Sequence, residues 1–166
     1  MKRYLSNILI YIAALFGIVA FTGLFASPLS ILDQIKGTWS SYNVKAYLGE
    51  VQNGVKVYKG TFTPVIGFLL PFVMSIFLII ESFRPKLRPK LKIINTLLSI
   101  LYFASAVLVL LTKELWLTIN NYGDALIIRN GVGPIMSAIL STLSGILLTI
   151  VTWVPGQKEI DFIDKV

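Results

Sequence analysis

The sequence predicts an all-helical membrane fold: a four-helix transmembrane bundle with a small β-hairpin or sheet cap outside the cytoplasm. Three observations lead to this expectation. The 166 residues have a mean hydropathy of +0.78 and only 14% are charged, whereas a soluble domain carries about 25% charged residues. Four long stretches contain no charge at all, and the loop after the first of them is rich in strand-forming residues.

The uncharged stretches define the helices. They cover residues 4–32, 60–80, 93–112 and 130–157. About 20 apolar residues in a helix cross a hydrocarbon core of about 30 Å, and a backbone in lipid must satisfy its own hydrogen bonds. We therefore expect helices near 7–27, 64–82, 94–112 and 133–154, which together make residues 1–166 one integral membrane domain.

The first helix could also be read as a secretory signal, because the chain begins Met1-Lys2-Arg3. The apolar stretch that follows is longer than the 7–15 residues usual for a signal. We therefore expect this helix to be retained as a membrane anchor.

The basic residues predict the topology. The segment 83–93 holds five of them and no acid: Arg84, Lys86, Arg88, Lys90 and Lys92. Such a loop stays in the cytoplasm, so both termini, including the tail 155–166, should be cytoplasmic and the protein should lie in the plasma membrane. The loops 28–63 and 113–132 should then lie outside. The same five residues should contact anionic lipid headgroups, while nucleic acid is not an expected partner of so short a cluster.

The first outer loop predicts a hairpin of residues 42–51 and 55–62 around Asn53-Gly54, a strong turn signal. A two-residue turn places Glu50 opposite Val57. A three-residue turn with Gly54 left-handed places Glu50 opposite Lys56, and the ion pair favours it. That register also gathers one apolar face, formed by Val44, Ala46, Leu48, Tyr58 and Phe62. Exposed aromatic side chains should provide contacts to other molecules, with Trp39, Tyr47 and Tyr58 as candidates.

The second outer loop contains a β-prone run at 125–129. Because an isolated hairpin is marginally stable, we expect this run to pair with, or pack against, the sheet of the first loop. The third helix could instead continue outward through Trp116 to about Ile119. The two expectations are compatible.

This layout of four spans, cytoplasmic termini, a large β-containing first outer loop and a shorter second one resembles the claudin-like four-span (tetraspan) membrane proteins. The resemblance is one of layout. That family carries a tryptophan pair around Gly-Leu and two disulfide-bonded cysteines in its first loop, whereas this loop has only Trp39 and the chain has no Cys. No residue role is therefore carried over from the family.

The residue inventory argues against catalysis. The chain has neither Cys nor His, which excludes thiol nucleophiles, disulfides and histidine-based sites. No zinc-protease, nucleophile-elbow or phosphate-loop motif occurs. The middle of each span lacks ionisable residues, and Glu81 should form an interfacial ion pair with Arg84. We expect no enzyme activity, no cofactor and no metal.

Small residues recur at every fourth position of the last span and form one helix face: Gly133, Ser137, Ser141, Gly145 and Thr149. Such a face permits close helix packing, either within the bundle or against a partner subunit. Ala13, Gly17 and Ala20 form a weaker counterpart, so the first and last helices should be neighbours. Pro71 should kink the second span.

These features predict a non-enzymatic multi-pass protein that acts by association, either as a self-assembling subunit or as an accessory subunit of a larger membrane complex. Its partners would be the lipid bilayer and other proteins or copies of itself. A passive channel or transporter for a small neutral or anionic solute is the alternative. A lipid- or quinone-binding subunit without catalytic groups is a third possibility.

Overall fold

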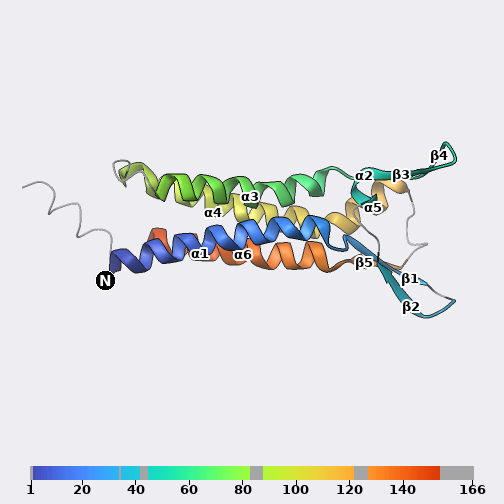
Figure 1. The fold of residues 1–166 in the computed structure, drawn as a ribbon, viewed down its shortest axis with the longest axis horizontal. Helices are drawn as coiled ribbons and strands as arrows, with labels where there is room; N and C mark the ends of the chain where they lie inside the picture. Colours follow the sequence, from blue (N-terminus) through green and yellow to red (C-terminus); the bar gives the residue numbers. More distant parts are fainter. Residues whose placement is uncertain (1, 34, 42–44, 83–87, 122–126, 154–166) are drawn as a thin grey trace, which may run out of the picture.

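The structure is a computed structural model that describes residues 2–33, 35–41, 45–82, 88–121 and 127–153. Four long helices lie side by side, with the strands gathered at one end of them (Figure 1). These helices are α1 (Lys2–Thr22), α3 (Thr63–Ser82), α4 (Arg88–Leu110) and α6 (Val132–Trp153). All four are long and apolar enough to cross a membrane, as the charge spacing predicts.

The helices form a closed ring in which each packs on two others. Helix α1 lies against α3 and α6, and α4 lies against the same two. The expected contact between the first and last helices is therefore present. Helix α4 begins at Arg88, earlier than the expected residue 94, because Pro89 in the first turn of a helix removes only an N–H that would have no partner.

The outward faces of the helices are apolar. Large exposed side chains include Ile66 and Val73 on α3 and Ile100 and Val107 on α4, whereas the serines Ser75, Ser105, Ser137, Ser141 and Ser144 are fully buried. An exposed apolar surface of this extent would be unfavourable in water and suits a lipid environment.

Pro71 shows how the bundle satisfies its backbone. Proline lacks an N–H, so the carbonyl of Gly67, four residues earlier, loses its partner within α3. The hydroxyl of Ser105, on α4, donates to that carbonyl at 2.7 Å. A neighbouring helix thus provides the hydrogen bond that the proline removes, as expected for proline within a membrane helix.

A second hydroxyl contact lies one turn further along α3. The Ser75 hydroxyl donates to the Pro71 carbonyl at 2.6 Å and lies 2.8 Å from the hydroxyl of Tyr102 on α4. Gly17 of α1 packs directly against this group, since a Cβ at Gly17 would lie 2.7 Å from the Tyr102 hydroxyl oxygen. Small residues and hydroxyls therefore hold α1, α3 and α4 together here.

Three strands form a sheet at one end of the bundle. They are β1 (Leu29–Asp33), β2 (Thr38–Ser41) and β5 (Ile128–Asn130), in the antiparallel order β2-β1-β5. Ile31 lies opposite Ser40 of β2 and Ile128 of β5. The expected pairing of the second outer loop with the first is confirmed for β5, although its partner is β1 and not the predicted hairpin. Residues 125 and 126 of the predicted strand lie outside the described residues.

The predicted hairpin is formed by β3 (Gly49–Gln52) and β4 (Val55–Lys59). Asn53 and Gly54 both have positive φ, 50° and 78°, which makes a two-residue turn. The expected three-residue turn with Glu50 opposite Lys56 is therefore wrong. A bulge after Glu50 then shifts the pairing and places Glu50 opposite Tyr58, so the two-residue register does not extend to Glu50 either.

Within the expected strand 42–51, residues 42–44 lie outside the described residues, and the next four form instead a helical turn, α2 (Lys45–Leu48). Ala46 and Tyr47 are consecutive and both buried, which a strand with alternating faces cannot achieve. The expected shared apolar face is also wrong, because Leu48 and Phe62 are exposed; Val44 lies outside the described residues.

Two other helices complete the cap: η1 (Gly23–Phe25) and α5 (Thr112–Asn120). Helix α5 carries the chain outward through Trp116 as expected, but as a separate helix, because α4 ends at Leu110.

The hydrogen bond from Ser105 yields a first prediction. Ser105→Ala should lower the free energy of unfolding by about 1 kcal/mol, because the Gly67 carbonyl is left without a donor. In a Pro71→Ala background, residue 71 regains an N–H that can bond to Gly67, so the same serine substitution should cost clearly less.

Unfolding in mixed detergent micelles measures both effects. Thr118→Ala is the matched control, because the Thr118 hydroxyl is exposed and donates to the Glu114 backbone carbonyl within its own helix. Equal costs of Ser105→Ala with and without Pro71 would contradict this account of the proline.

Candidate functional site: the sheet cap

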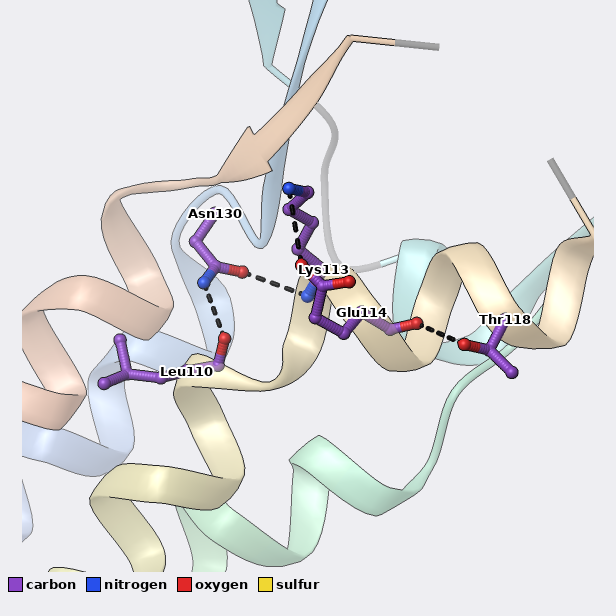
Figure 2. Close-up of polar contacts among 5 residues, drawn as sticks. All are labelled: Leu110, Lys113, Glu114, Thr118 and Asn130. Carbon is purple, nitrogen blue, oxygen red and sulfur yellow. Dashed lines mark hydrogen bonds and ion pairs between the residues drawn. The ribbon is translucent and has the colours of Figure 1, made fainter. Parts of the chain in front are cut away.

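The sheet cap comprises β1 to β5, α2, α5 and η1, and one asparagine fixes its three-stranded sheet to the junction between α4 and α5. Asn130 of β5 donates through Nδ2 to the Leu110 carbonyl at 2.7 Å, and its Oδ1 accepts from the Lys113 N–H at 3.0 Å (Figure 2). Leu110 ends α4 and Lys113 lies in the first turn of α5. A single side-chain amide therefore joins β5 to both sides of the junction between these helices.

A second asparagine fixes the hairpin in the same way. The Oδ1 of Asn120, the last residue of α5, accepts from the Lys59 N–H at 2.6 Å, and its Nδ2 donates to the Lys59 carbonyl at 3.2 Å. The side-chain amide thus pairs with the end of β4 much as a neighbouring strand would. Helix α5 holds both sheets, one through each asparagine.

The cap has its own apolar core. Leu29, Ala46, Tyr58 and Ile128 cluster with Trp116 of α5, and the Tyr58 and Trp116 rings lie 5.9 Å apart. The Tyr58 hydroxyl also donates to Glu50 at 2.9 Å across the hairpin. Residues from both sheets thus meet around one tryptophan, which makes the cap a packed unit.

Tyr47 connects this unit to the bundle. Its ring contacts Phe68 of α3 edge-on at 5.7 Å between centroids, and the side chain is fully buried. Burial raises the pKa of Tyr47 well above its usual range, and the nearby Thr112 hydroxyl only partly opposes this rise. Tyr47 and Tyr58 are both buried core residues. Their side chains are therefore not accessible for the expected contacts to other molecules.

Trp39, the third contact candidate, lies on the surface. It is 40% exposed on β2, and the Arg129 guanidinium of β5 lies 3.9 Å from its ring centroid. This cation–π contact spans β1 and fixes the orientation of the ring. Trp39 is therefore accessible and ordered at the same time.

The turn between β1 and β2 is built to hold an apolar residue outward. Asp33 Oδ1 accepts from the N–H groups of Ile35 and Lys36 at 3.0 and 3.1 Å, and Gly37 has the positive φ of 63° that the turn requires. Ile35 is 97% exposed at the tip. The hydrogen-bonded turn thus presents Ile35 to the surroundings.

The outer edge of β2 has no strand beside it in the described part of the chain, and all four of its residues are exposed. Leu32 donates its N–H to Ile127 on the β5 side of β1 at 3.0 Å. Because Leu32 lies opposite Trp39 and Ser30 opposite Ser41, the alternation of an antiparallel ladder directs the backbone groups of Trp39 and Ser41 away from β1. These groups form a free edge.

The small residues of α6 face the interior of the bundle. Gly133 packs on the Gly23 carbonyl of η1, and Ser141 lies 3.5 Å from the Ser105 hydroxyl of α4. Thr149 lies 2.7 Å from the Ser99 hydroxyl, which donates to the Gly145 carbonyl at 2.8 Å. Most of this face thus contacts α4 rather than α1. A neighbouring residue of α6, Ser144, makes the contact to α1: its hydroxyl donates to the Ala13 carbonyl at 2.9 Å. Ser137 is buried, and its hydroxyl has no hydrogen-bond partner among the residues that the structure describes.

The candidate basic residues divide into two sets. Arg84 and Lys86, and with them the expected ion pair of Arg84 with Glu81, lie outside the described residues. Arg88, Lys90 and Lys92 begin α4, and the Lys92 ammonium lies over the Trp153 ring. Among the described residues, no three His, Cys, Asp or Glu side chains are grouped in a way that could hold a metal ion.

Comparisons with protein-family models, curated proteins and solved structures found no match to this chain.

Sequence reasoning missed both asparagines and the strands β1 and β2. The run Leu29-Ser30-Ile31-Leu32 after Pro28 is a short β-prone signal that could have revealed β1. Asn120 and Asn130 carry no comparable signal, because a loop of this kind is rich in asparagine whether or not the side chains bridge distant backbone groups.

Asn130 provides a test of the cap. Asn130→Ala should speed amide hydrogen exchange at Lys113 and in β1 and β5 by about tenfold, because two hydrogen bonds to the α4–α5 junction are lost. Asn130→Asp keeps the acceptor for Lys113 and should retain part of that protection.

Mass spectrometry on the full chain measures the rate of amide hydrogen exchange in each segment separately. The hairpin of β3 and β4 is the internal control, since Asn120 holds it independently. Unchanged exchange at Lys113 in Asn130→Ala would show that the amide bridge does not hold the junction.

Proposed function

We propose that the chain is a non-catalytic, multi-pass subunit of the plasma membrane that binds a partner protein through its sheet cap. The proposed topology follows from the end of the bundle at which the basic residues lie. The start of α1, with Lys2 and Arg3, and the start of α4, with Arg88, Lys90 and Lys92, lie at the end opposite the strands (Figure 1). Positive residues stay in the cytoplasm, so the cap faces outside.

The free edge of β2 is the observation that carries this proposal. An edge strand exposes unpaired N–H and C=O groups that can pair with another chain, and soluble proteins often block such edges with Lys or Pro. The residues of β2, Thr38-Trp39-Ser40-Ser41, include neither. Ile35 and Trp39 flank this edge with exposed apolar surface, which would provide side-chain contacts to an added strand.

A different protein suits this edge better than a second copy. The hairpin of β1 and β2 runs outward from the end of the bundle (Figure 1). Two copies in one membrane are related by an axis along the membrane normal, and this axis leaves outward-running strands pointing the same way. Identical edges then meet in parallel, where their donors and acceptors do not alternate as a ladder requires. An extended segment of a partner has no such restriction, which favours an accessory subunit over self-assembly.

The interior of the bundle gives less support to the alternative of a solute channel. The buried hydroxyls of Ser75, Ser99, Ser105 and Ser144 all donate to backbone carbonyls. Groups engaged in this way hold helices together, and they would have to break these bonds to line a path for a solute.

A pair of substitutions at Ser41 tests the proposed edge pairing. Ser41→Pro removes a backbone N–H that points away from β1, where the fold does not need it, and should weaken partner binding about tenfold or more. Ser41→Ala keeps the N–H and should bind normally.

Blue-native electrophoresis of gently solubilised membranes measures the effect. The wild type and Ser41→Ala should migrate as a larger assembly, and Ser41→Pro as the free chain. Two differently tagged copies of the chain, expressed together, distinguish the partners, because only self-association brings both tags into one band. A wild type that migrates alone, or an assembly unaffected by Ser41→Pro, would contradict the proposal.

A further inference from the structure

A shallow groove lies on the outer face of the bundle at the end opposite the sheets. Five of its lining residues come from α4 and the sixth, Trp153, from the end of α6: Lys92, Ile93, Thr96, Leu97, Ile100 and Trp153. Its volume is about 390 Å³. The groove is separate from the sheet cap and from the hydroxyl contacts buried between the helices.

One end of the groove is positively charged. The Lys92 ammonium lies 4.1 Å from the centroid of the Trp153 ring, which fixes this flexible side chain by a cation–π contact. Within the described ranges, the only ion pair joins Lys113 to Glu114, at the cap, so Lys92 has no carboxylate partner there. Arg88 and Lys90 precede it in the same helix, whose first turn contains no acid.

The rest of the groove is apolar and follows the helix into the span. Ile93, Leu97 and Ile100 are 74%, 57% and 58% exposed, and their spacing places them on one face of α4. From Lys92 to Ile100 the helix rises about 12 Å. A positive group near the end of α4 is thus followed by exposed apolar side chains. They continue along the outer face of the helix toward its middle.

We propose that this groove binds an anionic phospholipid, with the phosphate group at Lys92 and one acyl chain along Ile93, Leu97 and Ile100 beside Trp153. The charge at the end of the groove selects an anionic headgroup, and the apolar stripe selects a lipid over a free phosphate, which could use only Lys92. The lipid lies in the leaflet at the end opposite the cap. This inference is independent of the proposed partner at β2.

Trp153 reports directly on the groove. The full-length protein is reconstituted into phosphatidylcholine vesicles in which a fixed fraction of lipid is replaced by brominated phosphatidylglycerol or brominated phosphatidylcholine. Bromine quenches tryptophan fluorescence on contact, and the difference between wild type and Trp153→Phe isolates Trp153 from Trp39 and Trp116, which lie in the cap. Competition between the two lipids gives their relative affinity at the groove.

The expected result is a preference of Trp153 for the brominated anionic lipid of about fivefold, the contribution of one lysine near a charged surface. Lys92→Gln should abolish this preference, whereas Lys92→Arg should retain it. Lys92 is exposed, so neither change should disturb the fold. Lys113→Gln, which removes one positive charge at the opposite end, is the matched control and should change nothing.

Equal quenching of Trp153 by the two brominated lipids in the wild type would overturn the proposal. An anionic preference that survives Lys92→Gln would also overturn it, because the selectivity would then come from the general charge of the basic segment. Addition of inorganic phosphate should not relieve the quenching; relief would show that the site binds a free anion and not a lipid.

Discussion

The rest of the structure depends on the requirement that backbone polar groups in an apolar solvent find partners within the protein. Helix formation satisfies most of them. Pro71 leaves the carbonyl of Gly67 without a helical partner, and Ser105 of α4 provides one at 2.7 Å. Ser99 and Ser144 likewise donate to carbonyls of neighbouring helices. The hydroxyls buried in the bundle thus hold the helices together where apolar burial, the usual driving force in water, is absent.

The same rule operates in a different form at the cap. There the chain must leave the bundle, turn and return, and two asparagine amides replace backbone partners where regular structure stops. Asn130 connects β5 to the α4–α5 junction, and Asn120 continues the ladder of β4. Around Trp116, residues of both sheets form a small core. These side chains thus join the cap to the bundle, and the edge of β2, which has no neighbouring strand in the described part of the chain, belongs to the surface of the cap.

The spans could be predicted from the sequence because charge is so costly in lipid that its absence over 20 residues is a clear signal. The turn at Asn53-Gly54 was predictable for a similar reason, since few residue pairs adopt positive φ. The register beyond it was not, because the bulge at Glu50 depends on where Tyr58 packs against Trp116.

The small-residue face of α6 predicted close packing correctly but not its main partner, α4, since spacing on one helix does not identify its neighbour. Burial placed Tyr47 and Tyr58 in the core and left Trp39 exposed, a difference that aromatic composition alone cannot show.

We propose that lipid surrounds the four helices, that the sheets face outside and that the start of α4 faces inside. The chain has no native cysteine, so single cysteines can be placed at each end without background. Ser40→Cys lies on the exposed strand β2, and Lys90→Cys lies in the basic segment at the start of α4. With a membrane-impermeant maleimide applied to intact cells, Ser40→Cys should be labelled, and Lys90→Cys should be labelled only after the membrane is permeabilised. Labelling of Lys90→Cys in intact cells, or release of the chain from membranes without detergent, would contradict it.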